Sequence, residues 1–129
     1  MGSKTDYLEN KVLDVVVNSI AYTTPGVVWS ALFTAIPSDA SGGTECTDSS
    51  YLRVTTQFCT AGATTDGQVV TTAAVTFATC ATAYTVVGWA LFDASASGNM
   101  LYWATVTTLA IGVGDQATFA VGNITITED

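Results

Sequence analysis

The chain has 129 residues and a net charge of −8, from 3 basic and 11 acidic residues, and it contains no histidine. This length indicates one domain, and three basic residues are too few to neutralise a phosphate backbone, which argues against nucleic-acid binding. Without histidine there is no Ser-His or Cys-His pair, no His-ligated zinc and no usual general base near neutral pH, so we expect a protein that is not an enzyme and holds no cofactor or metal ion.

The first element along the chain is a helix in segment 1–24, which we expect to form an N-terminal arm. Asp6 and Glu9 have the spacing of a capping box, in which each side chain satisfies a backbone N–H of the first helical turn. Apolar residues then recur every three or four positions, which gives the helix one apolar face. That face is expected to comprise Leu8, Val12, Val15, Val16 and Ile20.

Beyond Pro25 and Gly26 the alternation shortens to two residues, and threonine and valine dominate, as is typical of strands. We expect residues 25–129 to form a single domain in which turn clusters separate seven strands. The predicted fold class is mainly β: an antiparallel two-layer β-sandwich or jelly roll with one N-terminal α-helix. The expected strands are Val27–Thr34, Tyr51–Phe58, Gln68–Phe77, Tyr84–Phe92, Met100–Leu109, Gln116–Val121 and Asn123–Thr127.

Two of these strands differ in the number of apolar faces. The alternation in Val27–Thr34 is expected to give one core face. Tyr84–Phe92 is apolar on both faces, so it should be a central strand that is covered on two sides. Its second face then needs either the N-terminal helix or a neighbouring subunit as cover.

Two polar loops could hold a metal ion, but a structural explanation is preferred for both. Asp39, Glu45 and Asp48 could form a carboxylate pair or a calcium site, although the serines and glycines around them indicate a mobile, solvated loop. The segment Asp93–Asn99 begins like a calcium loop, but Ala104 stands where the bidentate glutamate is needed. We therefore expect a hairpin turn there and no metal site.

Arg53 is the only basic residue outside the N-terminal segment. We expect it to form a structural salt bridge with Glu45 rather than to bind a substrate. Four aromatic residues could form a stacking platform for carbohydrate, but all lie in expected strands, which favours core positions. They are Trp29, Trp89, Tyr102 and Trp103.

The three cysteines, Cys46, Cys59 and Cys80, contain no CxxC pair. Neither a disulfide framework nor a zinc cage follows from their spacing, and we expect reduced, partly buried thiols. One Cys46–Cys59 or Cys59–Cys80 bridge remains open as an alternative in an oxidising medium.

Charged residues make up only 11% of the chain and hydrophobic residues 49%. Much of the surface is therefore expected to be uncharged and easily desolvated against a partner. No apolar stretch approaches the length of about 18 residues that spans a bilayer, so we expect no membrane partner.

Short segments spread over nearly the whole chain resemble those of one family. They are Lys4–Lys11, Gly42–Glu45, Tyr51–Val54, Gly88–Ala94 and Ser97–Asn99, followed near the end by Gly114-Asp115, Phe119 and Ile124–Ile126. In these segments the chain resembles a family of small virion proteins of tailed bacteriophages. Members are often labelled tail-fibre proteins, while similar small β-proteins serve as capsid decoration, or cement, proteins.

The resemblance implies a structural virion protein, and we expect a decoration protein on the outer surface of the head, assembled in the host cytoplasm. Its expected partners are the major capsid protein and further copies of itself, as a dimer or trimer. The net charge of −8 disfavours the DNA-facing interior of the head. The residues expected to contact the capsid or a sister subunit are Lys4, Tyr7, Leu8, Lys11 and Val12.

Two alternative functions remain. The first is a tail or fibre component that touches the host surface with Asp39–Ser50 or Asp93–Asn99. The second is a glycan hydrolase using two of the carboxylates of Asp39, Glu45 and Asp48, which would have to be held at a defined separation. A flexible loop does not hold two carboxylates in this way, so the second alternative is disfavoured.

Overall fold

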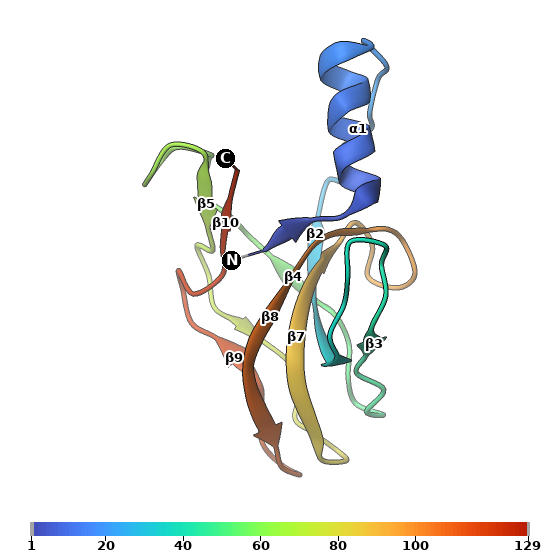
Figure 1. Ribbon diagram of the computed structural model, residues 1–129. Coiled ribbons are helices and arrows are strands. Elements are labelled where there is room, and N and C mark those ends of the chain that lie inside the picture. The colour runs from blue at the N-terminus through green and yellow to red at the C-terminus, as the bar shows by residue number, and fades with distance from the viewer. Residues whose placement is uncertain (1, 129) are drawn as a thin grey trace.

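A computed structural model describes residues 2–128, and it is mainly β with one helix near the N-terminus (Figure 1). The strands pair antiparallel, so the mainly β, antiparallel fold class with one N-terminal helix is confirmed. The elements are β1 (Ser3–Lys4), α1 (Asp6–Val17), β2 (Val28–Ala35), β3 (Thr44–Glu45), β4 (Val54–Thr56), β5 (Gln68–Val70), β6 (Val75–Thr76), β7 (Tyr84–Phe92), β8 (Met100–Ile111), β9 (Thr118–Phe119) and β10 (Thr125–Thr127).

The largest sheet has the strand order β1-β8-β7-β2-β3. Strand β2 is long enough to pair with β3 near its C-terminal end, at Phe33, and with β4 near its N-terminal end, at Val28. Strand β7 lies in the middle, as its apolar sequence predicts, and its bounds agree with those expected. Strand β8 has 12 residues against the 9 of β7, and register shifts accommodate the difference.

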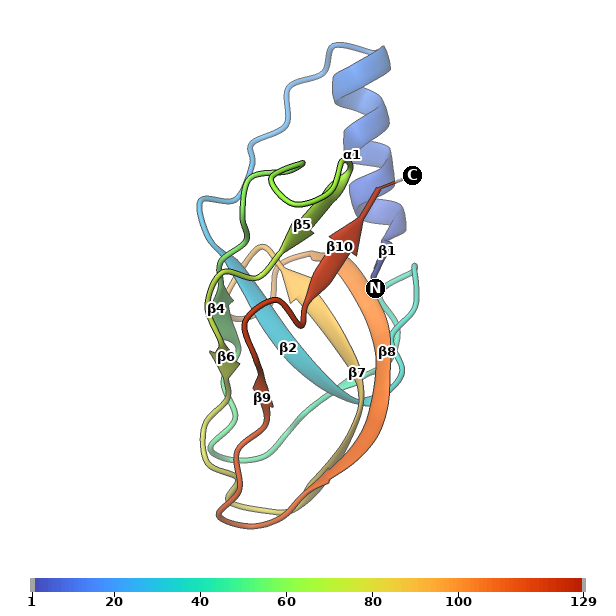
Figure 2. The same cartoon turned by 90° about the vertical axis from the view of Figure 1, so that its left-hand side faces the viewer.

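A second layer covers one face of this sheet (Figure 2). It consists of two short antiparallel pairs, β5 with β10 and β6 with β9. The main core lies between the layers, where Trp89 and Leu32 from the large sheet meet Phe77, Val75 and Ile124. The burial of these large apolar side chains holds the two layers together.

The opposite face of the large sheet has a smaller core of its own. Ala31 and Phe33 of β2 are buried there with Ala90 and Phe92 of β7. Strand β2 therefore has two core faces, because Leu32 faces the main core; the expectation of a single core face was wrong. The loop after β2 supplies part of the cover, since the buried Pro37 lies directly over Gly88.

The expected strand Gln68–Phe77 is divided into β5 and β6. Thr71 lies between them with only 1% of its surface exposed, and its N–H donates to the carbonyl of Ile124 (3.1 Å). Its carbonyl and hydroxyl both accept from the N–H of Gly122. These bonds turn the chain from its pairing with β10 to its pairing with β9.

Candidate assembly interface

The N-cap residue of helix α1 is buried and hydrogen-bonded inside the fold. Thr5 is fully buried, and its hydroxyl oxygen accepts from the N–H of Leu8 (3.4 Å), which makes it the N-cap. The same hydroxyl donates to the carbonyl of Met100 (2.6 Å), at the start of β8. The expected capping box of Asp6 and Glu9 was therefore one residue out of place, because Thr5 supplies the cap.

The segment before the helix is also held in place. Strand β1 pairs with β8, and the Lys4 ammonium donates to the Glu128 carboxylate. The Tyr102 hydroxyl donates to the same carboxylate (2.7 Å). Partial burial raises the pKa of Glu128, but the hydrogen bonds from Lys4 and Tyr102 outweigh it, so the pKa of this carboxyl lies below its usual value.

The five residues expected to contact a partner fall into two groups. Lys4 and the buried Leu8 are used inside the subunit. Tyr7 and Lys11 are half-buried, and the Lys11 ammonium lies 5.7 Å from the centre of the Tyr7 ring. Val12 is exposed, so it is the member of the set whose apolar side chain is free to meet a partner.

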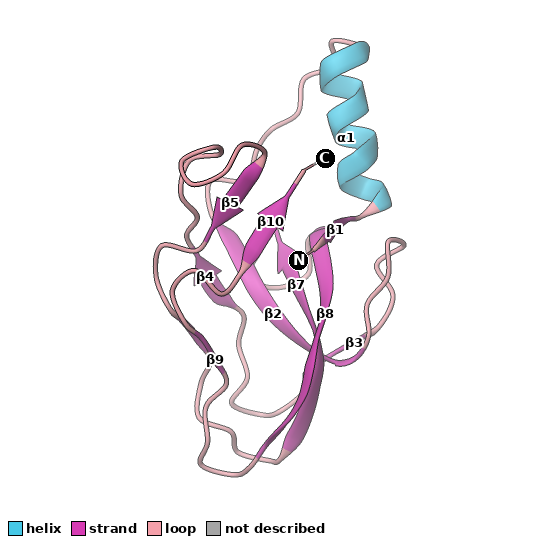
Figure 3. Cartoon of the chain, turned by 60° about the vertical axis from the view of Figure 1, so that its left-hand side comes forward, coloured by secondary structure: helices cyan, strands magenta, loops and turns pink. Residues whose placement is uncertain are grey.

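Beyond its first turns, α1 projects past the ends of the strands (Figure 3). Leu8 is the buried residue of the helix, whereas Val16 is 75% exposed and Val17 is 70% exposed. A helix with so many bare apolar side chains is typical of one that packs against another molecule. We call the exposed set the distal patch; it comprises Val12, Leu13, Val15, Val16, Val17 and Ile20.

Most of the distal patch was not among the expected contact residues. The three-residue run from Val15 to Val17 carried the signal, because three successive apolar residues on a helix cannot all face the same core. Ile20 lies just beyond the helix, and its N–H donates to the carbonyl of Asp14 (2.9 Å). This bond keeps Ile20 next to the last helical turn.

A second apolar surface lies at the other end of β8. A pocket of about 200 Å³ opens between β7, β8 and β9, and its lining is apolar apart from threonine. Leu109 on its edge is 55% exposed, so the pocket reaches the surface. We call it the β8 pocket; it is lined by Leu32, Val86, Val106, Thr107, Leu109, Ala117, Thr118 and Phe119.

The Arg53 side chain links its own segment to β3 and to the turn after β7. Its Nε and Nη2 atoms each donate to one carboxylate oxygen of Glu45, both at 2.8 Å. Its Nη1 donates to the carbonyls of Ala94 (2.9 Å) and Ser97 (2.7 Å), in the turn after β7. The guanidinium also lies over the Phe92 ring, 3.5 Å from its centre. All three guanidinium nitrogens therefore donate hydrogen bonds within the subunit.

The carboxylates considered for a metal site or for hydrolysis are held in separate networks. Asp39 accepts from the indole of Trp103 (2.6 Å), while Glu45 is paired with Arg53. Asp48 accepts from the Ser50 hydroxyl (2.6 Å) and from the N–H of Thr82 (2.6 Å), so it is tied to a turn rather than lying in a mobile loop. Within residues 2–128, no three His, Cys, Asp or Glu side chains are grouped so as to hold a metal ion.

The segment Asp93–Asn99 forms the expected tight turn. The Asp93 carboxylate accepts from the backbone N–H of Asn99 (2.7 Å) and from its side-chain amide (2.8 Å). Ser97 and Gly98 both have positive φ, of 53° and 74°. The Asp93 oxygens are thus engaged by the turn itself.

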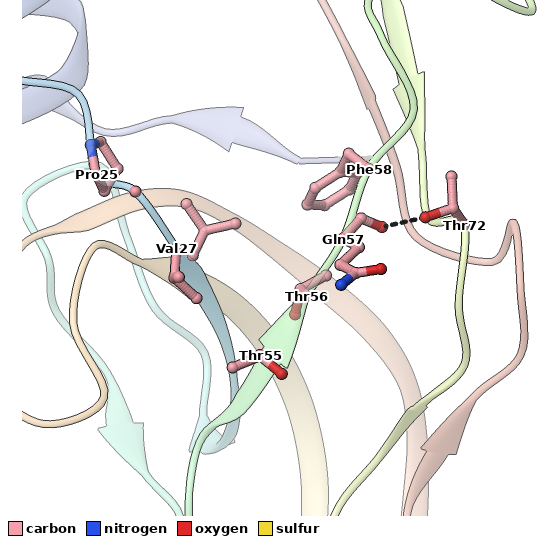
Figure 4. A pocket seen from close by; sticks show the side chains of 9 residues that line it. Pro25, Val27, Thr55, Thr56, Gln57, Phe58 and Thr72 are labelled. Carbon is pink, nitrogen blue, oxygen red and sulfur yellow. Dashed lines mark hydrogen bonds between the residues drawn. The ribbon is translucent and has the colours of Figure 1, made fainter.

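A hollow of about 530 Å³ lies between the start of β2 and the end of β4 with the segment that follows it (Figure 4). Its lining is uncharged and includes Pro25, Val27, Phe58 and Thr72, and the Thr72 hydroxyl donates to the carbonyl of Gln57 (3.4 Å). The lining offers hydroxyls, an amide and apolar side chains, which suit contact with a neutral surface rather than acid–base or nucleophilic chemistry.

The aromatic residues considered as a sugar platform do not share one surface. Trp89 is fully buried and its indole donates to the Ser30 hydroxyl (2.9 Å). Tyr102 packs against the main core and Trp103 against the smaller one, so they lie on opposite faces of the sheet. The three cysteines are free thiols, with Cys46 and Cys80 buried and Cys59 half-buried.

No helix within residues 2–128 has the length and hydropathy that crossing a bilayer demands. The family described as Podophage GP4 fiber I protein gp80 matches residues 3–127 of the chain. Among curated proteins, none matches it. The match covers both ends of the fold, from β1 to β10, so it includes α1 and the β8 pocket.

Proposed function

Because this chain belongs to the podophage GP4 fiber I protein gp80 family, and so is a structural protein of a bacteriophage virion, we propose that it serves as a subunit of a fibre. In this role its activity is binding: each copy contributes surface that joins it to neighbouring virion subunits. The proposal includes the absence of catalysis, since the polar side chains considered for chemistry are engaged in structural bonds.

The distal patch is the observation that carries the proposal. Six apolar side chains, each more than 40% exposed, gather on and just beyond one projecting helix. Together they present on the order of several hundred Å² of apolar surface, which is as large as the largest patch on a typical monomer. A subunit that joins an assembly buries such a surface, and each Å² of apolar surface removed from water is worth about 25 cal/mol of favourable free energy.

The remaining surface also suits an assembled part. Charged residues are only 11% of the chain, and the outward side chains of β8 include Thr105, Thr107 and Thr108. Hydroxyl groups cost less to desolvate than charges, and they find new partners across an interface. A threonine-rich surface can therefore bind other subunits and still keep the free subunit soluble.

A capsid decoration role is the second candidate. The acidic charge of −8 favours an outer location over the DNA-filled interior, and threonine-rich strands suit contact with a lattice of major capsid proteins. In this role too, self-association as a dimer or trimer and contact through α1 would supply the binding energy. The two candidates differ in where the protein sits and in its copy number.

Quantitative gel analysis of purified virions, and of heads and tails separated from them, tests the proposal. A fibre subunit is expected in the tail fraction, at a copy number that is a small multiple of the tail symmetry. A decoration protein would remain with the heads in many copies, which would replace the fibre proposal by the second candidate. Absence of the protein from both fractions would overturn both.

A further inference from the structure

A hollow of about 340 Å³ lies where two polar loops meet, one before β3 and the other after β7. The first loop contributes Ser41 and Gly43 to its lining, and the second contributes Asn99. These loops belong to Asp39–Ser50 and Asp93–Asn99, the two segments considered above for contact with the host surface. We call it the loop hollow, and its volume is within the range of about 300 to 1,000 Å³ that is typical of sites for small molecules.

The ion pair of Arg53 and Glu45 is part of the lining of the loop hollow. A guanidinium has five N–H donors, and four of those of Arg53 donate to Glu45 and to the two carbonyls after β7. The fifth, on Nη2, has no partner within residues 2–128, although the side chain is only 7% exposed. The Oε2 atom of Glu45, which accepts from the same Nη2, has room for a second donor. A free donor and a free acceptor therefore lie next to each other.

This arrangement selects the chemistry of a ligand. The two charges of the pair cancel, so the pair attracts neither an anion nor a cation strongly. A hydroxyl group fits, because its oxygen accepts from an N–H while its hydrogen donates to a carboxylate, and such bonds to charged groups are strong. The Asn99 amide offers the same combination: one N–H donates to Asp93, while the second N–H and the oxygen have no partner within residues 2–128. Two donor–acceptor pairs in one hollow suit a ligand with several hydroxyls.

The lining of the loop hollow also offers an aromatic contact. Tyr7 of α1 is half-buried there, so part of its surface is accessible. A sugar ring packs its C–H groups on an aromatic side chain while its hydroxyls bond to the polar groups around it. The hollow between β2 and β4 also has an aromatic residue, Phe58, but its lining contains no charged donor or acceptor.

Arg53 fixes the two loops relative to each other, so the loop hollow is formed before a ligand arrives. It bonds to Glu45 in β3 and to the carbonyl of Ser97 in the other loop. Ser41 and Ser97 have φ of 62° and 53°, a conformation that residues other than glycine rarely adopt and that is concentrated at binding sites. A preformed site loses less conformational entropy when it binds.

We propose that the loop hollow binds a neutral glycan, whose hydroxyls bond to Arg53, Glu45 and Asn99 and whose sugar ring packs on Tyr7. The glycan is bound and not cleaved, because hydrolysis uses two carboxylates and Glu45 supplies the one carboxylate of the lining. The inference rests on the proposed fibre function for its biological meaning, since a fibre subunit reaches the polysaccharides on the surface of the host bacterium. It deepens that function by naming the class of ligand.

Isothermal titration calorimetry of the full-length protein tests the inference, with the neutral O-polysaccharide of a bacterium that the phage infects as the probe. The wild type is expected to bind. Tyr7→Ala removes the ring and Asn99→Ala removes the amide but keeps the backbone bond to Asp93, and each is expected to raise the dissociation constant at least about tenfold. Gln57→Ala, in the hollow between β2 and β4, is the matched control and is expected to bind like the wild type.

The dependence on salt tests whether the ligand is recognised without charge. Raising sodium chloride from about 0.1 M to about 1 M shortens the screening length from about 10 Å to about 3 Å, and we expect the dissociation constant to change by less than about threefold. A change of more than about tenfold would indicate recognition by charge and would overturn the assignment of a neutral glycan. So would a wild type that does not bind. A loss of binding in Gln57→Ala but not in the two other variants would place the site elsewhere and overturn it too. Circular dichroism of each variant separates lost binding from lost folding.

These outcomes are separable from those of the virion experiment. A protein that is present in tails but does not bind the polysaccharide would overturn the glycan site and leave the fibre proposal standing. A protein that binds the polysaccharide through Tyr7 and Asn99 but is absent from virions would do the reverse.

Discussion

Replacing Arg53 with methionine removes one side chain that joins three segments. The change deletes both bonds to Glu45 and both bonds to the carbonyls of Ala94 and Ser97, while it keeps a chain of similar length over Phe92. The Arg53 side chain is only 7% exposed, so water replaces these bonds poorly. Removing one partner of a buried ion pair typically costs 3 to 5 kcal/mol.

The structure places the expected loss at the lower end of that range. The Glu45 side chain is 28% exposed and still accepts from the Tyr51 hydroxyl (2.9 Å), so it is partly solvated and partly bonded when Arg53 is gone. We expect the free energy of unfolding to fall by about 3 kcal/mol. For a chain of this size that corresponds to a decrease of about 10 °C in Tm. Arg53→Lys keeps the charge but not the forked geometry, and we expect it to lose about 2 kcal/mol.

Urea unfolding followed by tryptophan fluorescence measures these changes, since Trp89 is fully buried in the folded protein. Lys11→Met is the matched control: it also removes one positive charge, but from the half-buried Lys11 on α1, and the expected loss is below about 0.5 kcal/mol. A loss of less than about 1 kcal/mol for Arg53→Met, or equal losses for the two variants, would refute the assigned role of Arg53.

Three further predictions concern single side chains. Hydrogen bonds, first from the Ser50 hydroxyl, lower the pKa of Asp48 in the folded protein. Its contribution to stability is therefore present above the unfolded pKa of about 3.9 and is lost as the pH falls through the folded pKa. In acid titrations of urea unfolding, the stability difference between the wild type and Asp48→Asn should shrink below about pH 4. Ser30→Ala leaves the buried indole of Trp89 without its acceptor, and should lower the free energy of unfolding by about 1 to 3 kcal/mol; an unchanged urea midpoint would contradict this. Gly88→Ala places a methyl group 2.7 Å from Cδ of Pro37, and should lower Tm in calorimetry, with about 1 to 3 kcal/mol lost to overpacking.

The sequence predicted well those helices and strands that are determined by neighbouring residues in the chain. Strand β7 has the expected bounds, since an apolar run between two turn clusters is read from neighbouring residues. The N-terminal helix was also expected, although its N-cap is Thr5, whose hydroxyl accepts from the N–H of Leu8 and donates to Met100 of β8. The bond to Met100, which is 95 residues away along the chain, holds the Thr5 side chain in place, and the local D-x-x-E spacing at Asp6 gave no sign of it.

The features that the sequence could not predict depend on distant segments. The division of Gln68–Phe77 follows from the bonds of Thr71 to Gly122 and Ile124, which only the folded chain brings together. The β8 pocket likewise combines residues from Leu32 to Phe119. Periodicity showed that α1 has apolar residues at helical spacing, but not that most of them lie beyond the reach of the core.

The attachment of α1 to β8 has a mechanical consequence. A pull on the helix is transmitted through Thr5 and β1 to the first residues of β8, and from there along a strand that pairs with β7 from Met100 to Ile111. Tension applied along this strand loads its hydrogen bonds side by side, in shear, so many must rupture at once before β8 slides. The molecule is thus expected to be stiffest along the axis that joins the helix to the far end of the sheet, and softest when its edge strands are peeled away one bond at a time.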